Sequence, residues 1–160
     1  MRETRVSKPA NVLISVHQTH AMSFKTGKKT VELRRRSVQL PPGTTVWIYS
    51  KVPKGSIDLL GTVDQVISAT PENLWRKFGT RTGISKAQFN TYFRNSAFGS
   101  AIILREIKRL SPTVELGSMR EISNGFQPPQ FLKFLDENSP ELKLLKLSRR
   151  LPTGSKRNGV

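Results

Sequence analysis

Short runs of hydrophobic and β-branched residues, separated by turn residues, recur along the chain and predict strands. The predicted strands cover residues 12–16, 30–36, 46–49, 57–69 and 101–110. In the second run the side chains alternate, so Val31 and Leu33 face one side of the strand while Glu32 and Arg34 face the other. Gly61 interrupts the fourth run and predicts a bulge or bend there.

Helices are predicted where capping residues stand beside segments without strand character. Gly27 suits the C-cap of a short helix over residues 17–26. Thr70 before Pro71 combines an N-cap with proline at the first helical position, so a helix is expected to about Phe78. The other predicted helices are residues 86–93 behind the N-cap Ser85, a short helix between Pro128 and about Leu135, and residues 141–150.

Five or six strands with short helices between them predict an α+β fold. Because strands and helices do not alternate regularly, a small mixed β-barrel is favoured over a Rossmann sheet. A length of 160 residues is that of one ordinary domain. The remaining internal segment, residues 112–123, is predicted to be a loop containing one short strand.

The charge changes this picture, because 27 Lys and Arg residues stand against 11 Asp and Glu, a net charge of +16. Between residues 5 and 57 the only acid is Glu32, and residues 73–105 contain none. Such a field attracts polyanions, which favours nucleic acid or a nucleotide as the partner. A solvated basic surface is the plainer alternative.

The composition also excludes several classes of protein. Without cysteine the chain has no disulfide framework, thiolate metal site or Cys nucleophile. The first apolar run, residues 12–14, is too short for a signal peptide or a membrane-spanning helix, so a cytoplasmic protein without membrane contact is predicted. His17 and His20 lack a nearby acid and do not predict a zinc site, and no cofactor motif is present.

The most unusual stretch is residues 27–36, in which one acid stands in a basic strand. Glu32 beside Arg34 should remain ionised and held by charge-assisted hydrogen bonds, leaving guanidinium forks for a phosphate or a base edge. Lys29 is out of register with Glu32 by strand parity and shares the site only if residues 27–29 form a turn or bulge. Equally, this stretch fits an exposed edge strand whose charges prevent aggregation.

Two further features extend the candidate site. Tyr49 approaches the loop at Ser50 and Lys51 and is the aromatic residue predicted to stack on a base. Several C-terminal basic residues fit either a second phosphate contact or a solubilising tail: Lys143, Lys146, Arg149, Arg150, Lys156 and Arg157.

Taken together, these motifs resemble those of the ASCH domain family. The resemblance spans about residues 12–135 and rests on the following segments: Leu13-Ile14-Ser15-Val16, Gly27-Lys28-Lys29-Thr30-Val31-Glu32-Leu33-Arg34, Val46-Trp47-Ile48-Tyr49-Ser50, Gly83-Ile84-Ser85 and Pro128-Pro129-Gln130-Phe131. It implies a PUA-like barrel with a cleft lined by the Lys-x-x-Glu-x-Arg strand, and a role in RNA binding. Residues 1–11 would then be a flexible basic arm, and residues 136–160 a basic C-terminal helix and tail.

The resemblance also implies two alternative activities. Some members of the family look like ribonucleases, and others hydrolyse acetylated cytidine with a lysine, a threonine and a glutamate as catalytic residues. The family lysine corresponds to Lys29 and its arginine to Arg34. The position of the hydrolase threonine is Glu32 here, and a carboxylate would have to act as a general base instead. Thr30 is near but in a different register.

The resulting prediction is a module that binds RNA or a nucleotide in a basic cleft. Its predicted binding residues are Lys28, Lys29, Glu32, Arg34, Arg36, Tyr49, Ser50, Lys51 and Gln130. The rival prediction is an enzyme with Lys29 and Glu32 as catalytic residues, either a metal-independent ribonuclease or an amidohydrolase acting on an acetylated pyrimidine nucleoside. A DNA-binding regulator is a weaker alternative because no helix-turn-helix is evident. The sequence does not determine the oligomeric state.

Overall fold

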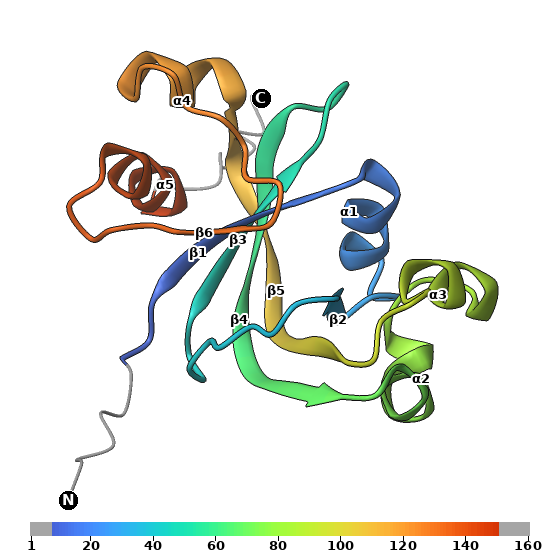
Figure 1. Ribbon diagram of the computed structural model, residues 1–160. Coiled ribbons are helices and arrows are strands. Elements are labelled where there is room, and N and C mark those ends of the chain that lie inside the picture. Colours follow the sequence, from blue (N-terminus) through green and yellow to red (C-terminus); the bar gives the residue numbers. More distant parts are fainter. Residues whose placement is uncertain (1–7, 151–160) are drawn as a thin grey trace, which may run out of the picture.

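The computed structural model describes residues 8–150, whose strands form one curled half-barrel sheet (Figure 1). The strands are β1 (Asn11–Val16), β2 (Val31–Arg34), β3 (Thr45–Ser50), β4 (Ser56–Ala69), β5 (Gly99–Glu115) and β6 (Leu132–Phe134). Across the sheet they lie in the order β2-β5-β4-β3-β1-β6, with β1 and β3 parallel and the other neighbours antiparallel. This mixed sheet confirms the predicted α+β, barrel-like fold. The register between β4 and β5 shifts around Gly61, as its glycine predicts.

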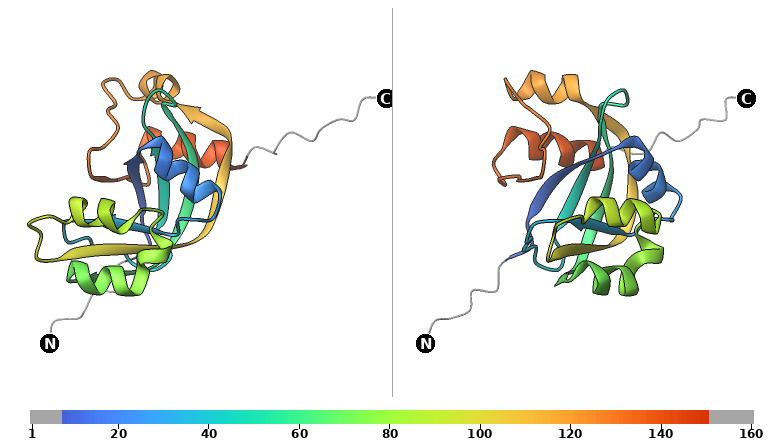
Figure 2. Two further views of the ribbon diagram at one scale, coloured as in Figure 1. Left: turned by 90° about the vertical axis from the view of Figure 1, so that its right-hand side faces the viewer. Right: turned by 45° about the vertical axis from the view of Figure 1, so that its right-hand side comes forward.

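Helices cover the sheet on two sides (Figures 1 and 2). They are α1 (Gln18–Lys25), α2 (Pro71–Phe78), the 3-10 helix η1 (Gly79–Arg81), α3 (Lys86–Tyr92), α4 (Leu116–Ile122) and α5 (Pro140–Arg150). The side chain of Thr70 caps α2, and Ser85 forms a capping box with Gln88 at the start of α3, which confirms both predicted helix starts. In Figure 1, α1, α2 and α3 lie to one side of the sheet and α4 and α5 to the other.

Three predicted boundaries are wrong. Residues 112–123 are not a loop, because β5 stays paired with β4 as far as Glu115 and α4 follows directly. The short helix expected near Leu135 is strand β6, in which Leu132 pairs with Ile14 of β1. The strand expected over residues 30–36 ends at Arg34. Arg34 pairs with Ser100, and the partner strand β5 begins only one residue before Ser100, so no partner residues remain for a strand that reaches residue 36. In each case pairing with a distant strand decided the outcome.

The core consists of three apolar clusters, one for each layer of helices. Phe24 of α1 closes the cluster inside the half-barrel. Met119 of α4 and Leu145 of α5 close the cluster on the opposite face of the sheet. Leu74 of α2 and Phe89 of α3 close the third, over β2. Strand alternation therefore buries apolar side chains on both faces of the sheet, as expected for strands covered on both sides.

The helix that the sequence places beyond residue 135 packs into this same core. Leu142 and Leu145 of α5 are fully buried against the second cluster. The predicted N-terminal arm is described only from residue 8, and the predicted tail from residue 151 lies outside the described residues. Within residues 8–150, no helix has the length and apolar character needed to cross a membrane.

Candidate functional site

A cleft of about 1190 Å³ opens between β2, α1, α3 and the segment that leads into β6. It lies where the two edge strands of the sheet approach each other. There Arg34, the last residue of β2, donates from Nη1 to the carbonyl oxygen of Phe131 at 3.2 Å. The Arg34 side chain thus connects the β2 edge of the half-barrel with the segment before β6, and both Arg34 and Phe131 line the cleft.

A tight turn places Lys29 in the cleft. Gly27, with φ of +79°, ends the α1 segment, and the Lys29 amide donates to the carbonyl of Ser23 at 3.0 Å. Lys29 also forms an isolated β-bridge with Thr82. The turn moves Lys29 out of strand register, which is the condition the sequence sets for Lys29 to join Glu32.

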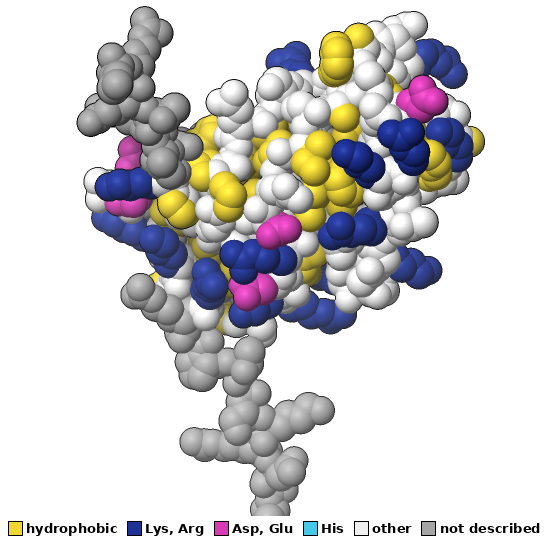
Figure 3. Space-filling model, turned by 90° about the horizontal axis from the view of Figure 1, so that it is seen from below, with side chains coloured by type: hydrophobic (Ala, Val, Ile, Leu, Met, Phe, Trp, Pro, Cys, Tyr) yellow, Lys and Arg dark blue, Asp and Glu magenta, His cyan; other side chains and the backbone are white. Residues whose placement is uncertain are grey.

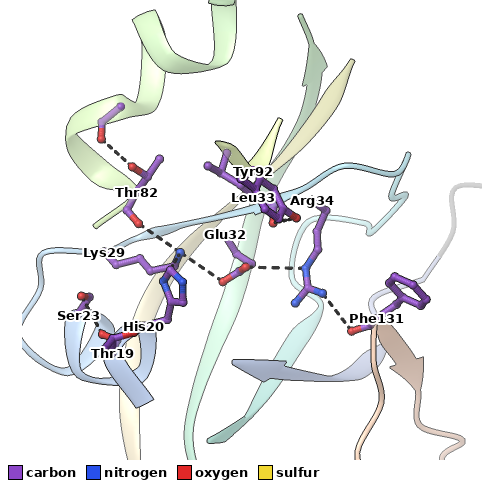
Figure 4. A network of polar contacts seen from close by, with 11 residues as sticks. Thr19, His20, Ser23, Lys29, Glu32, Leu33, Arg34, Thr82, Tyr92 and Phe131 are labelled. Carbon is purple, nitrogen blue, oxygen red and sulfur yellow. Dashed lines mark hydrogen bonds and ion pairs between the residues drawn. The ribbon is translucent and has the colours of Figure 1, made fainter. Parts of the chain in front are cut away.

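Lys29, Glu32 and Arg34 form a buried charged cluster (Figure 4). Glu32 Oε2 lies 3.5 Å from Lys29 Nζ, and Glu32 Oε1 lies 3.8 Å from Arg34 Nε. The exposed fraction is 2% for Lys29 and 9% for Glu32. Charges this far from water need partners, and here one carboxylate is shared by two cations.

His20 on α1 completes the cluster. Its Nδ1 lies 3.4 Å from Lys29 Nζ, which also donates to the carbonyl of Thr82 at 3.2 Å. Burial lowers the pKa of His20, and the charge of Lys29 lowers it further. The imidazole is therefore neutral near pH 7 and can accept a hydrogen bond from the Lys29 ammonium group.

Three buried polar atoms at the cleft have no hydrogen-bond partner among the described residues. They are an acceptor, Glu32 Oε2, a donor, Arg34 Nε, and the hydroxyl of Ser15 at the end of β1. Within residues 8–150, Glu32 Oε2 and Arg34 Nε take part only in the longer ion-pair contacts of 3.5 and 3.8 Å. Buried polar groups are almost always hydrogen-bonded, so three atoms without a hydrogen bond in one place indicate a site for a polar ligand.

The cleft is strongly basic. Among the described residues that line it, Glu32 is the acid and five are Lys or Arg: Lys29, Arg34, Arg35, Arg36 and Lys51. Lys and Arg side chains also predominate over acidic ones on the molecular face seen in Figure 3. A basic cleft around a single carboxylate suits an anionic ligand that also carries hydrogen-bond donors.

The other predicted site residues divide into two groups. Arg36, Lys51 and Gln130 line the cleft together with the central cluster. Lys28 instead borders a smaller neighbouring hollow beside Trp75.

Two of the predicted binding residues are buried elsewhere. Tyr49 is 4% exposed and packs in the second core cluster, so it is not the expected stacking residue. Ser50 is buried as well and donates to Asp58 Oδ1 at 2.9 Å, while Lys25 of α1 pairs with Asp58 Oδ2 at 2.6 Å. Both side chains are buried because β3 is paired with β4 along its full length. The contacts of Asp58 with Ser50 and Lys25 hold α1 against the sheet.

The predicted binding residues do not include two aromatic residues that line the cleft, Tyr92 and Phe131. Tyr92 of α3 is half-buried and donates its hydroxyl hydrogen to the carbonyl of Leu33 at 3.2 Å. Burial raises the pKa of Tyr92. Phe131 lies beyond Arg34, at the end of the network away from Lys29 (Figure 4). Their aromatic character was visible, but only the fold brings α3 and the segment before β6 to one cleft.

No protein-family model matches the chain. A protein of Zymomonas mobilis described as an ASCH domain-containing ribonuclease is 30% identical over 149 residues, covering 92% of this chain and 99% of that protein. This chain belongs to the ASCH domain family. The crystal structure of ASCH from Zymomonas mobilis has a TM-score of 0.80 with this ASCH domain at 29% identity, covering 86% of this chain and 95% of the other.

More distant structures share the fold of this ASCH domain. The N-terminal domain of Staphylothermus marinus McrB is 12% identical, with a TM-score of 0.55, over 90% of this chain and 96% of that one. Human THYN1, solved in complex with DNA containing 5-methylcytosine, is 10% identical, with a TM-score of 0.51, over 90% of this chain and all of that one. These likenesses bear on the fold alone.

Proposed function

We propose that this ASCH domain binds RNA in the basic cleft and cleaves it there. The observation that carries the proposal is the buried carboxylate of Glu32, which is shared by two cations in a basic cleft and whose Oε2 accepts no hydrogen bond from the described residues. The family relationship supports it, because the Zymomonas mobilis relative is described as a ribonuclease. The surrounding Lys and Arg side chains would bind the phosphates of the chain.

The arrangement suits cleavage by the ribose 2′-hydroxyl. Glu32 Oε2 takes the proton from this hydroxyl, and the oxygen attacks the adjacent phosphorus. The bond from phosphorus to the 5′ oxygen breaks, a cyclic phosphate forms, and the leaving oxygen takes a proton from solvent. Lys29 and Arg34 stabilise the charge that develops on the phosphoryl oxygens.

Binding without cleavage is the second candidate function. It is favoured by the two ion pairs of Glu32, since a carboxylate held between cations also serves as a fixed acceptor for a base or ribose edge. Hydrolysis of an acetylated pyrimidine nucleoside is not proposed. Thr30, which directly precedes β2, accepts a hydrogen bond from Arg81 Nε at 2.9 Å and does not line the cleft.

Glu32→Gln separates the two candidates, because it keeps the shape of the side chain and removes the base. We expect cleavage of labelled single-stranded RNA to fall by about 100- to 10,000-fold, the usual contribution of a general base. Retardation of the same RNA on a gel should persist and weaken steeply as salt is raised.

The matched control is Glu121→Gln, which removes an exposed acid from α4. It should leave both cleavage and retardation unchanged. Intact RNA retarded by the wild type and by both variants would assign binding alone. No retardation and no cleavage at low salt would refute the proposed function.

A further inference from the structure

Phe131 is a large apolar side chain held in an exposed position on the rim of the cleft. It is 52% exposed and belongs to none of the three core clusters. Its backbone is anchored, since its carbonyl oxygen accepts the hydrogen bond from Arg34. An exposed aromatic ring on an anchored backbone contributes little to folding and is well placed to bind a ligand.

The guanidinium group of Arg36 lies over this ring, 4.2 Å from its centroid. Arg36 is itself exposed, and it also lines the cleft. A planar, delocalised guanidinium beside an aromatic ring extends a flat surface while keeping its positive charge.

The neighbouring residue, Arg35, makes a similar contact with the other aromatic residue of the cleft. Arg35 lies over Tyr92, 5.2 Å from the ring centroid, and the hydroxyl of Tyr92 is fixed on the carbonyl of Leu33. Two successive arginines that follow β2 therefore each cover an aromatic ring at the same cleft. Both pairs combine a flat apolar surface with a cation, which is the chemistry of sites that bind unpaired nucleotides.

We propose that Phe131 and Arg36 form a stacking platform for one unpaired base of the RNA, beside the Lys29–Glu32–Arg34 cluster. The proposal rests on the proposed function and names its substrate class as single-stranded or looped RNA. Inside a duplex each base is covered on both faces by its neighbours, so a base within the paired region cannot stack on the ring. The phosphate next to the stacked base meets the Arg36 charge.

The test uses a 2′-O-methyl RNA, which cannot be cleaved through its 2′ oxygen, with 2-aminopurine as a fluorescent base at one position. Wild type should bind the single strand more tightly than a blunt duplex of the same length, and stacking should quench the fluorescence. Phe131→Ala should weaken single-strand binding by about 5- to 150-fold, the range for loss of one base–aromatic stack. It should also abolish the quenching.

Phe134→Ala is the matched control, because Phe134 is 58% exposed on β6 and does not line the cleft. It should behave as wild type, and Phe131→Trp should retain both binding and quenching. Equal effects of the two alanine variants, or equal affinity for single strand and duplex, would overturn the platform. Because the probe is not cleaved, these readouts test the platform separately from cleavage, which the Glu32→Gln assay measures.

Discussion

At the scale of single residues, the site depends on how buried charges are neutralised. Lys29 is almost fully buried, and its ammonium group faces the Glu32 carboxylate, the Thr82 carbonyl and the ring of His20. His20 can fill this place only when its Nδ1 is unprotonated. Protonation would put a second cation against Lys29 and leave the ammonium group short of an acceptor.

Stability should therefore depend on the charge of His20. Its pKa is lowered in the folded protein, so the unfolded chain takes up the proton first, near the ordinary value of about 6.5. The stability that neutral His20 supplies is present above that pH and is lost as the pH falls below it. Urea denaturation at pH 7.5 and 5.5 should show the wild type losing stability relative to His20→Gln, whose amide oxygen accepts at either pH.

The control for this measurement is His17→Gln, at an exposed position one residue before α1. This variant should follow the wild type at both pH values. A His20→Gln variant that loses as much stability as the wild type would contradict the assignment.

At the scale of elements, the cleft requires two chain segments to pass within contact distance. The turn after α1 carries Lys29, and the segment between η1 and α3 carries Thr82 and Gly83. Gly83 has φ of +72°, and a Cβ there would lie 3.1 Å from the Cβ atoms of both Lys29 and Ser23. The glycine is needed for its backbone conformation and for the close approach together.

Gly83→Ala should destabilise the fold by about 1–3 kcal/mol, since alanine is strained at positive φ and the crowded neighbours must move. It should also weaken RNA binding, because Lys29 is one of those neighbours. Chemical denaturation checks the first effect and gel retardation the second.

Gly117→Ala is the opposite control. Gly117 lies in α4, and an added Cβ would meet no atom within 4 Å other than those of its chain neighbours and the nearby helix backbone, so alanine there should raise stability by up to about 1 kcal/mol. Destabilisation of both variants by the same amount would contradict the argument from Gly83.

At the scale of the whole molecule, the half-barrel has helices on both faces and a basic cleft between its edges. β2 lies at one edge of the sheet, which is the position that the alternative prediction of a charged edge strand requires. The same strand also carries Glu32 into the cleft, so edge strand and candidate site are one element. α5 packs against the far face of the sheet and completes the second core cluster.

Leu145→Ala should therefore destabilise the entire domain by about 2–5 kcal/mol, the usual effect of removing a fully buried leucine side chain. Thermal unfolding should remain a single transition at a lower temperature. Leu147→Ala, at a position on the same helix that is 58% exposed, should change stability by less than about 0.5 kcal/mol. A separate early transition in Leu145→Ala would instead make α5 an independent appendage.

The elements predicted most accurately from the sequence are those specified by local chemistry. The caps at Thr70 and Ser85, the alternation along β2 and the bulge at Gly61 each depend on residues close in the chain. The elements predicted wrongly depend on distant pairing. β6 is a strand because β1 offers it an edge, and β5 continues past Pro112 because β4 lies beside it.

The same division holds for the candidate site. By itself the sequence determined the α+β class, the basic character and the presence of Glu32 and Arg34 on one side of a strand, because strand periodicity and charge are local properties. Only the tertiary structure decided that Lys29 turns back to Glu32, that Tyr49 is buried in the core, and that Phe131 meets Arg36. Residues 36 and 131 are far apart in the chain, and their contact exists only because the curled sheet brings its two edges together.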